Sequence, residues 1–358
     1  MASNAKNLAE YLNNETTSAT ADIADGSITT AKLADGGVTT AKVADNAVTS
    51  AKALNLGRRN LVINGAMNIA QRGTSSSAGG YCALDRFFVN LSGAAATFSQ
   101  ETVTLGDSVV GDFIKYARLN VSTGNNFCMI RHRIENVQSV KQGTATISFY
   151  AKGTNPGGGV CTIQASQRFG SGGSGDVDIA GQTFTLTSSW QRFDFQFTIP
   201  SISGKTIGTG GTSFQFDIGQ GSDTSTAAWQ IDITGIQVET GSVATDFEHL
   251  PIGEELALCQ RYYEVIDFPS STRTPVNLGQ GYQNRKYIAP LAFKVEKRAT
   301  PTSASVTWSI DGGDGTHSFT AQPSKSFLGF SSGTTSPNIG DSDIAYSPQQ
   351  TIYGDAEL

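Results

Sequence analysis

Alternation of apolar and polar residues with a two-residue period dominates the chain between residues 60 and 250. In the run 192–199, phenylalanine or isoleucine occupies every odd position and a polar residue every even position. The same period recurs at 214–218, 231–233 and 236–238. Successive side chains of a strand lie on opposite faces, so the pattern predicts half-buried strands with one polar face. Glycine-rich turns separate the runs, which indicates an antiparallel sandwich rather than a parallel α/β sheet.

A single convincing helical pattern follows these strands. Leu256, Cys259 and Tyr263 recur at the spacing of one helix face, and two glutamates begin the segment, where the helix dipole favours negative charge. We expect a short connecting helix over 251–266. Strand-like alternation resumes afterwards, which predicts a small C-terminal β domain over 267–358.

Residues 21–56 follow neither period. Ten-residue repeats begin at Ala24, Ala34 and Ala44, and their larger apolar residues fall at every fifth position. One such side chain per five residues is too little to close a core within one chain. The repeats therefore need apolar surface from neighbouring copies of the chain. The alternative interpretation is a flexible linker, but a linker has no need to hold an aliphatic residue at a strict interval.

Composition narrows the class of protein. The 358 residues include 40 glycines and only 16% charged residues, which suits an all-β protein with many turns. The formal net charge of -6 argues against a nucleic-acid partner, because phosphate binding needs a basic surface. No apolar run reaches membrane-spanning length, and the N-terminus lacks the features of a secretory signal, so we expect no membrane insertion.

The four cysteines are widely spaced and form no Cys-x-x-Cys pair, so we expect neither a zinc site nor a redox motif. Cys161 shares a predicted strand face with Ile163 and Ala165, which predicts a buried free thiol. The three histidines stand near no nucleophile motif. We therefore expect no catalytic residues, no enzymatic activity, no cofactor and no metal.

Two resemblances follow from these segments. The ten-residue repeats resemble the shaft repeats of bacteriophage tail fibres, which are generally homotrimers. Residues 57 to about 250 resemble the jelly-roll region of phage tail-fibre proteins, similar in design to carbohydrate-binding modules. The segments that carry this second resemblance are Asn60–Gly73, Tyr81–Phe87, Thr146–Gly153, Ser189–Phe193 and Ile231–Gly241. The helical segment and the stretches 293–301 and 355–358 are also similar to phage fibre sequences.

The expected architecture is all-β: an N-terminal docking peg (1–20), a trimeric repeat stalk (21–56), an antiparallel jelly-roll β-sandwich (57–250), a connecting helix (251–266) and a C-terminal β tip domain (267–358). A frayed tail is the alternative for the peg. The predicted trimer core of the stalk is Ile28, Leu33, Val38, Val43 and Val48.

The resemblance implies a tail-fibre subunit that attaches the virion to a host surface polysaccharide or lipopolysaccharide. Its N-terminus would join the phage tail or an adaptor protein, and assembly would take place in the host cytoplasm without a signal peptide. The alternative is a structural head fibre or capsid decoration protein without a receptor role. Residues near presumed loop tips are the candidate ligand contacts: Tyr282, Tyr287, His317, Arg168 and Phe169.

Several other charged and aromatic residues have a structural interpretation. We interpret Arg131 and Arg133, which flank a histidine, as solvated strand or turn charges. Trp190 is expected to cover the core rather than to serve as a sugar platform. For Arg72 and Arg86, the sequence suggests ion pairs with Asp85 or Glu239.

The first prediction concerns the stalk. Light scattering should give three times the chain mass of 37.6 kDa. Replacing Leu33 and Val43 with aspartate should dissociate the trimer, because each unpaired buried charge costs several kcal/mol. Aspartate at Lys32 and Lys42, which we expect to face solvent, should leave the mass unchanged. A monomer mass for the unmodified protein, or equal effects of the two pairs of substitutions, would contradict the layered trimer.

Overall fold

The computed structural model describes residues 58–124, 127–157, 159–221, 225–268 and 288–301, with shorter stretches at 274–277, 304–310, 313–321, 326–330, 344–347 and 350–357. Side chains are described within 58–265 and at 293–301 and 355–357. The expected docking peg and the trimeric stalk, with its five aliphatic core positions, lie outside the described residues.

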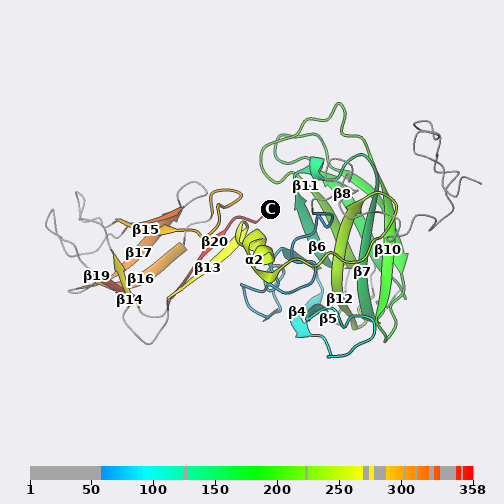
Figure 1. Ribbon diagram of the computed structural model, residues 1–358, viewed down its shortest axis with the longest axis horizontal. Coiled ribbons are helices and arrows are strands. Elements are labelled where there is room, and N and C mark those ends of the chain that lie inside the picture. The colour runs from blue at the N-terminus through cyan, green and yellow to red at the C-terminus, as the bar shows by residue number, and fades with distance from the viewer. Residues whose placement is uncertain are drawn as a thin grey trace, which may run out of the picture. The chain divides into compact units, whose positions relative to one another are not determined.

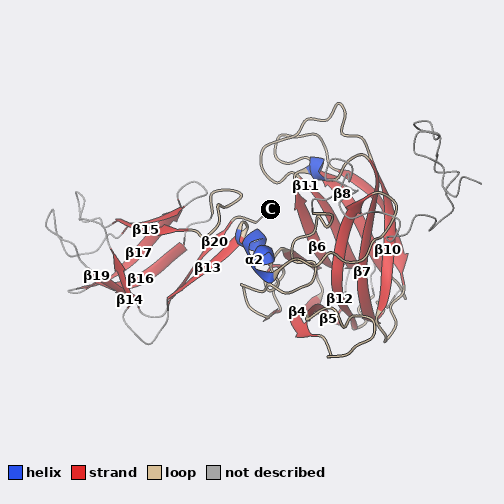
Figure 2. Cartoon of the chain, viewed as in Figure 1, coloured by secondary structure: helices blue, strands red, loops and turns tan. Residues whose placement is uncertain are grey.

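Two antiparallel six-stranded sheets form a sandwich (Figures 1 and 2). The first sheet has the order β1 (Ser75–Ser76), β4 (Ala95–Thr102), β5 (Lys115–Thr123), β12 (Trp229–Thr240), β7 (Gly143–Thr154) and β10 (Gln191–Ile199). The second has the order β2 (Gly80–Tyr81), β3 (Phe87–Ser92), β6 (Phe127–Glu135), β11 (Ser213–Gln220), β8 (Cys161–Arg168) and β9 (Val177–Phe184). The chain crosses repeatedly between the sheets, as in a jelly roll, and the sandwich expected from the alternation is present.

The core lies between the two sheets and follows the two-residue period. On β10, Phe195, Phe197 and Ile199 are buried, whereas the polar residues between them are exposed. Phe149 of β7 stacks against Phe195, with their ring centroids 5.9 Å apart. Burial of each such side chain contributes about 1.5–3 kcal/mol. Cys161 is buried in this core and free, as expected.

A bulge in β12 receives the N-terminal segment of the described chain. The pairing of β12 with β7 shifts register between Thr234 and Gln237. Gly235 lies within this bulge with a φ of 62°, and a Cβ there would meet the Phe113 ring at 2.6 Å, so glycine is required on both counts. The side chain of Asn60 donates to Ile236 O at 3.1 Å and accepts from the Val238 amide at 3.2 Å. Asn60 thereby ties the start of the sandwich to its last strand.

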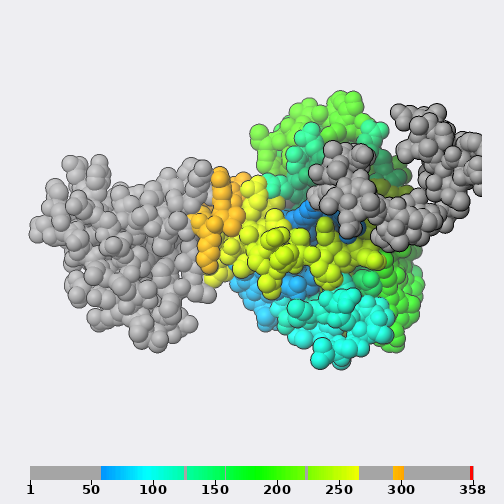
Figure 3. Space-filling view, viewed as in Figure 1, coloured from blue at the N-terminus to red at the C-terminus, as the bar shows by residue number. Residues whose placement is uncertain are grey.

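The connecting helix is shorter than the sequence suggested. Helix α2 spans Ile252–Gln260, and the expected continuation is instead the strand β13 (Tyr263–Phe268). That strand pairs with β20 (Gln350–Asp355), a partner from the far end of the chain. Residues 293–301 (orange) lie against the α2 region (yellow) in Figure 3, where the Arg298 amide donates to Arg261 O at 2.9 Å. A short 3-10 helix, η4 (Val137–Ser139), follows β6.

The remaining C-terminal strands form their own antiparallel sheet, whose backbone pairing is described. Its order is β14 (Thr274–Asn277), β19 (Ile344–Ser347), β16 (Ala304–Ile310), β17 (Gly313–Ala321), β18 (Ser326–Phe330) and β15 (Ile288–Ala292). This sheet lies within the segment expected to be a β tip domain. Along the chain the sheet is preceded by β13 and followed by β20, and residues 293–301, between β15 and β16, lie against the α2 region.

Buried arginines join the last residues of the chain to the sandwich. Arg86 is fully buried, pairs with Glu357, and lies with its guanidinium carbon 3.5 Å from the centroid of the Tyr262 ring. Arg72 contacts Glu357 at 3.3 Å and Asp355 at 3.1 Å. The burial of Arg86 would lower its pKa, but the adjacent Glu357 carboxylate outweighs this and raises the pKa.

The expected pairing of Arg72 and Arg86 with Asp85 or Glu239 is therefore wrong. Asp85 instead accepts hydrogen bonds from the backbone and side chain of Gln71. Glu239 accepts from Thr245. The true carboxylate partners come from the opposite end of the chain, which local sequence patterns do not reveal.

The second prediction tests these end contacts. Replacing Glu357 with alanine should lower the free energy of unfolding by about 3–5 kcal/mol, because it leaves the buried Arg86 uncompensated. The side chain of Asp355 is 35% exposed, and its replacement with alanine should cost about 0–1 kcal/mol. Urea denaturation of both variants measures the difference. Similar losses for the two would show that the Arg86–Glu357 pair has no special importance.

Candidate functional site

A cleft lies on the outer face of the second sheet, over strands β3, β6, β11, β8 and β9. Its volume is about 410 Å³. Most of the side chains that line it come from alternate positions on these strands, because the intervening positions point into the core. On β11, for example, Phe214 and Phe216 belong to the core, while Gln215 and Asp217 line the cleft. The polar face predicted for this strand is therefore the floor of a cavity.

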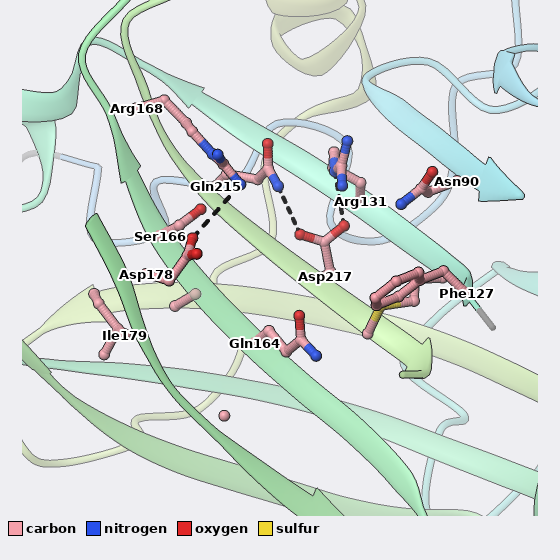
Figure 4. A pocket seen from close by; sticks show the side chains of 13 residues that line it. Asn90, Phe127, Arg131, Gln164, Ser166, Arg168, Asp178, Ile179, Gln215 and Asp217 are labelled. Carbon is pink, nitrogen blue, oxygen red and sulfur yellow. Dashed lines mark hydrogen bonds and ion pairs between the residues drawn. The ribbon is translucent and has the colours of Figure 1, made fainter. Parts of the chain in front are cut away.

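Polar and apolar groups share the lining, as Figure 4 shows. The polar lining residues are Asn90, Arg131, Gln164, Ser166, Arg168, Asp178, Gln215 and Asp217, and the apolar ones include Phe127, Met129 and Ile179. Met129 and Ser166 are buried, whereas Phe127 and Gln164 are half-buried. The cleft therefore offers hydrogen-bonding groups beside apolar surface.

A chain of hydrogen bonds fixes the centre of the cleft. Asp217 accepts from Arg131 Nε and from Gln215 Nε2, each at 2.7 Å, and Figure 4 shows both bonds. The other end of the Gln215 amide, Oε1, accepts from Arg133 Nε at 3.0 Å. The register explains this arrangement, since Arg131 is paired with Asp217 and Arg133 with Gln215 across β6 and β11. Each amide and guanidinium is thus held in one orientation before any ligand binds.

Arg168, at the end of β8, forms the upper edge of the cleft with two aspartates. Its Nη1 donates to Asp176 at 2.8 Å, and its Nη2 lies 3.7 Å from Asp178. Burial would raise the pKa of Asp176, but the hydrogen bonds from Arg168 and from the Phe169 amide outweigh it and lower the pKa. Asp176 therefore remains ionised and holds Arg168 beside the cleft.

The candidate ligand contacts from the sequence separate into three groups. Arg168 lines the cleft. Phe169, its neighbour, is 0% exposed, so its ring is not available to a ligand, and this part of the expectation needs correction. Tyr282 and Tyr287 lie outside the described residues, and for His317 only the backbone in β17 is described. These three remain predictions.

Sequence reasoning missed most of the cleft. Arg131 and Arg133 were interpreted as solvated charges, but both are half-buried and belong to its hydrogen-bond network. The available signal is the alternation of Gln215 and Asp217 with the core residues of β11, which are Phe214, Phe216 and Ile218. Trp190 is buried in a second apolar cluster with Phe113, which agrees with its interpretation as a core cover.

Among the residues that the structure describes, no group of three or more histidine, cysteine, aspartate or glutamate side chains is placed to hold a metal ion. His132 lies in the core, where its ring stacks on Phe216 and burial lowers its pKa well below the usual value. It is therefore neutral near pH 7.

No helix within the described part of the chain has the length and apolar character needed to cross a bilayer.

No protein-family model and no curated protein matches the sequence. The chain is similar to a CBM4 carbohydrate-binding module at 20% identity, over 50% of this chain and 98% of that chain, with a TM-score of 0.31. It is similar to a putative sugar-binding protein from Bacteroides thetaiotaomicron at 11% identity, over 51% and 100%, with a TM-score of 0.33. Tailspike protein 4 of bacteriophage CBA120 matches at 14% identity, over 50% and 21%, with a TM-score of 0.29.

The third prediction is that the hydrogen bonds among Arg131, Gln215 and Asp217 in the cleft also stabilise the folded protein. Replacing Asp217 with asparagine should lower the free energy of unfolding by about 1–3 kcal/mol, because Arg131 loses a charge-assisted hydrogen bond in a partly buried site. The matched control is Asp178→Asn. That carboxylate is 84% exposed, and its replacement should leave the urea midpoint unchanged. An unchanged midpoint for Asp217→Asn would mean that the network adds nothing to stability.

Proposed function

We propose that this protein is a bacteriophage tail-fibre subunit that attaches the virion to a glycan on the host cell surface, and that the cleft of the second sheet holds this glycan. The observation that carries the proposal is the cleft itself, whose polar groups are fixed by bonds to one another beside apolar surface. Small-molecule sites generally combine these two features.

The chemistry of the lining suits a sugar. A pyranose ring presents apolar C–H faces and a rim of hydroxyl groups. The half-buried Phe127 and Ile179 supply apolar surface for the faces, while Asn90 and Gln164 supply amides that both donate to and accept from hydroxyls. Because Gln215 and Asp217 are already oriented, a ligand does not have to order them on binding.

The N-terminal segments complete the proposal. The docking peg would join the fibre to the tail or to an adaptor protein. The trimeric stalk would present three copies of the cleft on each fibre of the virion. The fibre would be assembled in the host cytoplasm. Weak binding at a single cleft would then be strengthened by simultaneous attachment of several.

The fourth prediction places the site in the cleft rather than in the C-terminal β domain. Replacing Gln164 with tryptophan should fill the cleft and reduce binding to a microarray of bacterial surface polysaccharides by at least about tenfold. Thr198→Trp, at an exposed position on β10 of the other sheet, should bind like the unmodified protein. Urea denaturation should show both variants folded.

A triple variant separates the cleft from the tip. Replacing Tyr282, Tyr287 and His317 with alanine removes the candidate tip contacts and keeps residues 293–301, whose Lys297 pairs with the buried Glu264 and whose Arg298 donates to Glu357 O at 3.0 Å. This triple variant should retain glycan binding. Loss of binding here, with retention in Gln164→Trp, would move the site to the tip. If no protein binds any glycan, the head-fibre or decoration role replaces attachment.

A further inference from the structure

A second, smaller pocket adjoins the cleft and differs from it in charge. It has a volume of about 280 Å³ and is lined by Arg131, Arg133, Arg168, Gly170, Asp176, Gly211 and Gln215. Arg131, Arg168 and Gln215 also line the larger cleft, so the two cavities share part of their walls. Three arginines and one aspartate give the lining of the smaller pocket a formal charge of +2. Asp217, 2.7 Å from Arg131, and Asp178, 3.7 Å from Arg168, line the adjoining cleft and offset part of this charge.

The register of the second sheet brings the three guanidiniums together. Arg131 and Arg133 lie two residues apart on β6 and so share its outer face. Arg168 ends β8, and β11 lies between these two strands, with Gln215 paired to Arg133 and to Ser166. The side chains therefore converge over Gln215 from both sides. Gly170 and Gly211, with φ values of 75° and 73°, bring bare backbone to the wall.

Donor groups remain available in this pocket. Arg131 uses Nε for its bond to Asp217, and its two terminal amino groups make no hydrogen bond with described residues. Arg168 directs Nη1 to Asp176, while its Nη2 lies 3.7 Å from Asp178, beyond hydrogen-bond distance. Guanidinium groups bind carboxylate and phosphate oxygens through paired N–H groups, so these free donors match a planar or tetrahedral anion.

The electrostatic environment of Arg133 supports the same interpretation. Burial lowers its pKa, and the charges of Arg131 and Arg168 lower it further, against opposing contributions from Tyr81 and Asp217. The backbone of Arg133 is held in place, because its carbonyl accepts from Arg86 Nη2 at 2.6 Å. Like charges held this close together gain from a bound anion.

We propose that this three-arginine pocket is the subsite for an acidic substituent, a carboxylate or a phosphate, on the glycan held by the adjoining cleft. This inference rests on the proposed function. The cleft contacts the sugar ring and its hydroxyls, and the pocket selects glycans in which an acidic group projects from that ring.

The fifth prediction is that the protein prefers sugars with an acidic group. It is tested by titrating the full chain in a calorimeter with glucuronate, glucose 6-phosphate and glucose. At least one of the two acidic sugars should bind at least about tenfold more tightly than glucose. The one that binds identifies the substituent as carboxylate or phosphate, and binding of both identifies a general anion subsite. Arg133→Gln and Arg168→Gln should each reduce this preference by about tenfold.

The matched control is Arg192→Gln, which removes one positive charge from β10 on the other sheet and should preserve the preference. Equal binding of acidic and neutral sugars would overturn the subsite, as would a preference that survives both Arg133→Gln and Arg168→Gln. If the array shows binding of neutral glycans that Gln164→Trp abolishes, the attachment function stands although the subsite falls. If acidic sugars bind through the arginines but no surface glycan binds, the subsite stands and the attachment function falls.

Discussion

The contact between Arg86 and Glu357 is the interaction on which most of the described structure depends. It joins the beginning of the sandwich to the end of the chain, and both side chains are withdrawn from water. A buried guanidinium is tolerated only when its charge and donors are matched. Glu357 matches the charge, the Tyr262 ring covers one face, and the carbonyl of Arg133 accepts from Nη2, while Nε has no hydrogen-bond partner among the described residues. The side chain of Arg86 therefore links Glu357, near the end of the chain, to the backbone of β6.

This link reaches the candidate site. The residue whose carbonyl Arg86 holds is the one whose side chain turns outward to bond Gln215. From Gln215 the bonds continue to Asp217 and Arg131, so the cleft and the buried ion pair belong to one connected set of polar contacts. The inner face of β6 contributes apolar residues such as Ile130 to the core, which gives these outward groups a rigid base. A ligand would meet side chains whose orientations are already determined.

Much of the sandwich could be predicted from the sequence, because its strands carry their own local pattern. Alternation assigned Phe195 and Phe197 to the core and left the polar residues outside, as the structure shows. The helix was overestimated because Tyr263–Phe268 is compatible with either period, and pairing with β20 decides in favour of a strand. That partner is distant in sequence, so local reasoning had no access to it.

The site was less predictable for the same reason. A polar face on β11 can be solvated or can line a cavity, and the difference depends on which strands lie beside it. Arg131 comes opposite Asp217 only because β6 is the neighbour of β11. Adjacent residues such as Arg168 and Phe169 look equivalent in sequence, yet one lies at the cleft edge and the other is fully buried. Register and sheet order are properties of the whole domain.

The buried cysteines have a consequence for the chemical durability of the protein. Burial raises the pKa of Cys128 and of Cys161 to about 12, and that of Cys259 well above its usual value. A thiol with a pKa near 12 is ionised in only about one molecule in 100,000 at pH 7, and the thiolate is the reactive form. These sulfurs therefore resist oxidation and disulfide exchange for as long as the core stays closed. At these three positions the thiols stay unchanged when the protein passes from reducing to oxidising surroundings, whereas Cys82 is only half-buried.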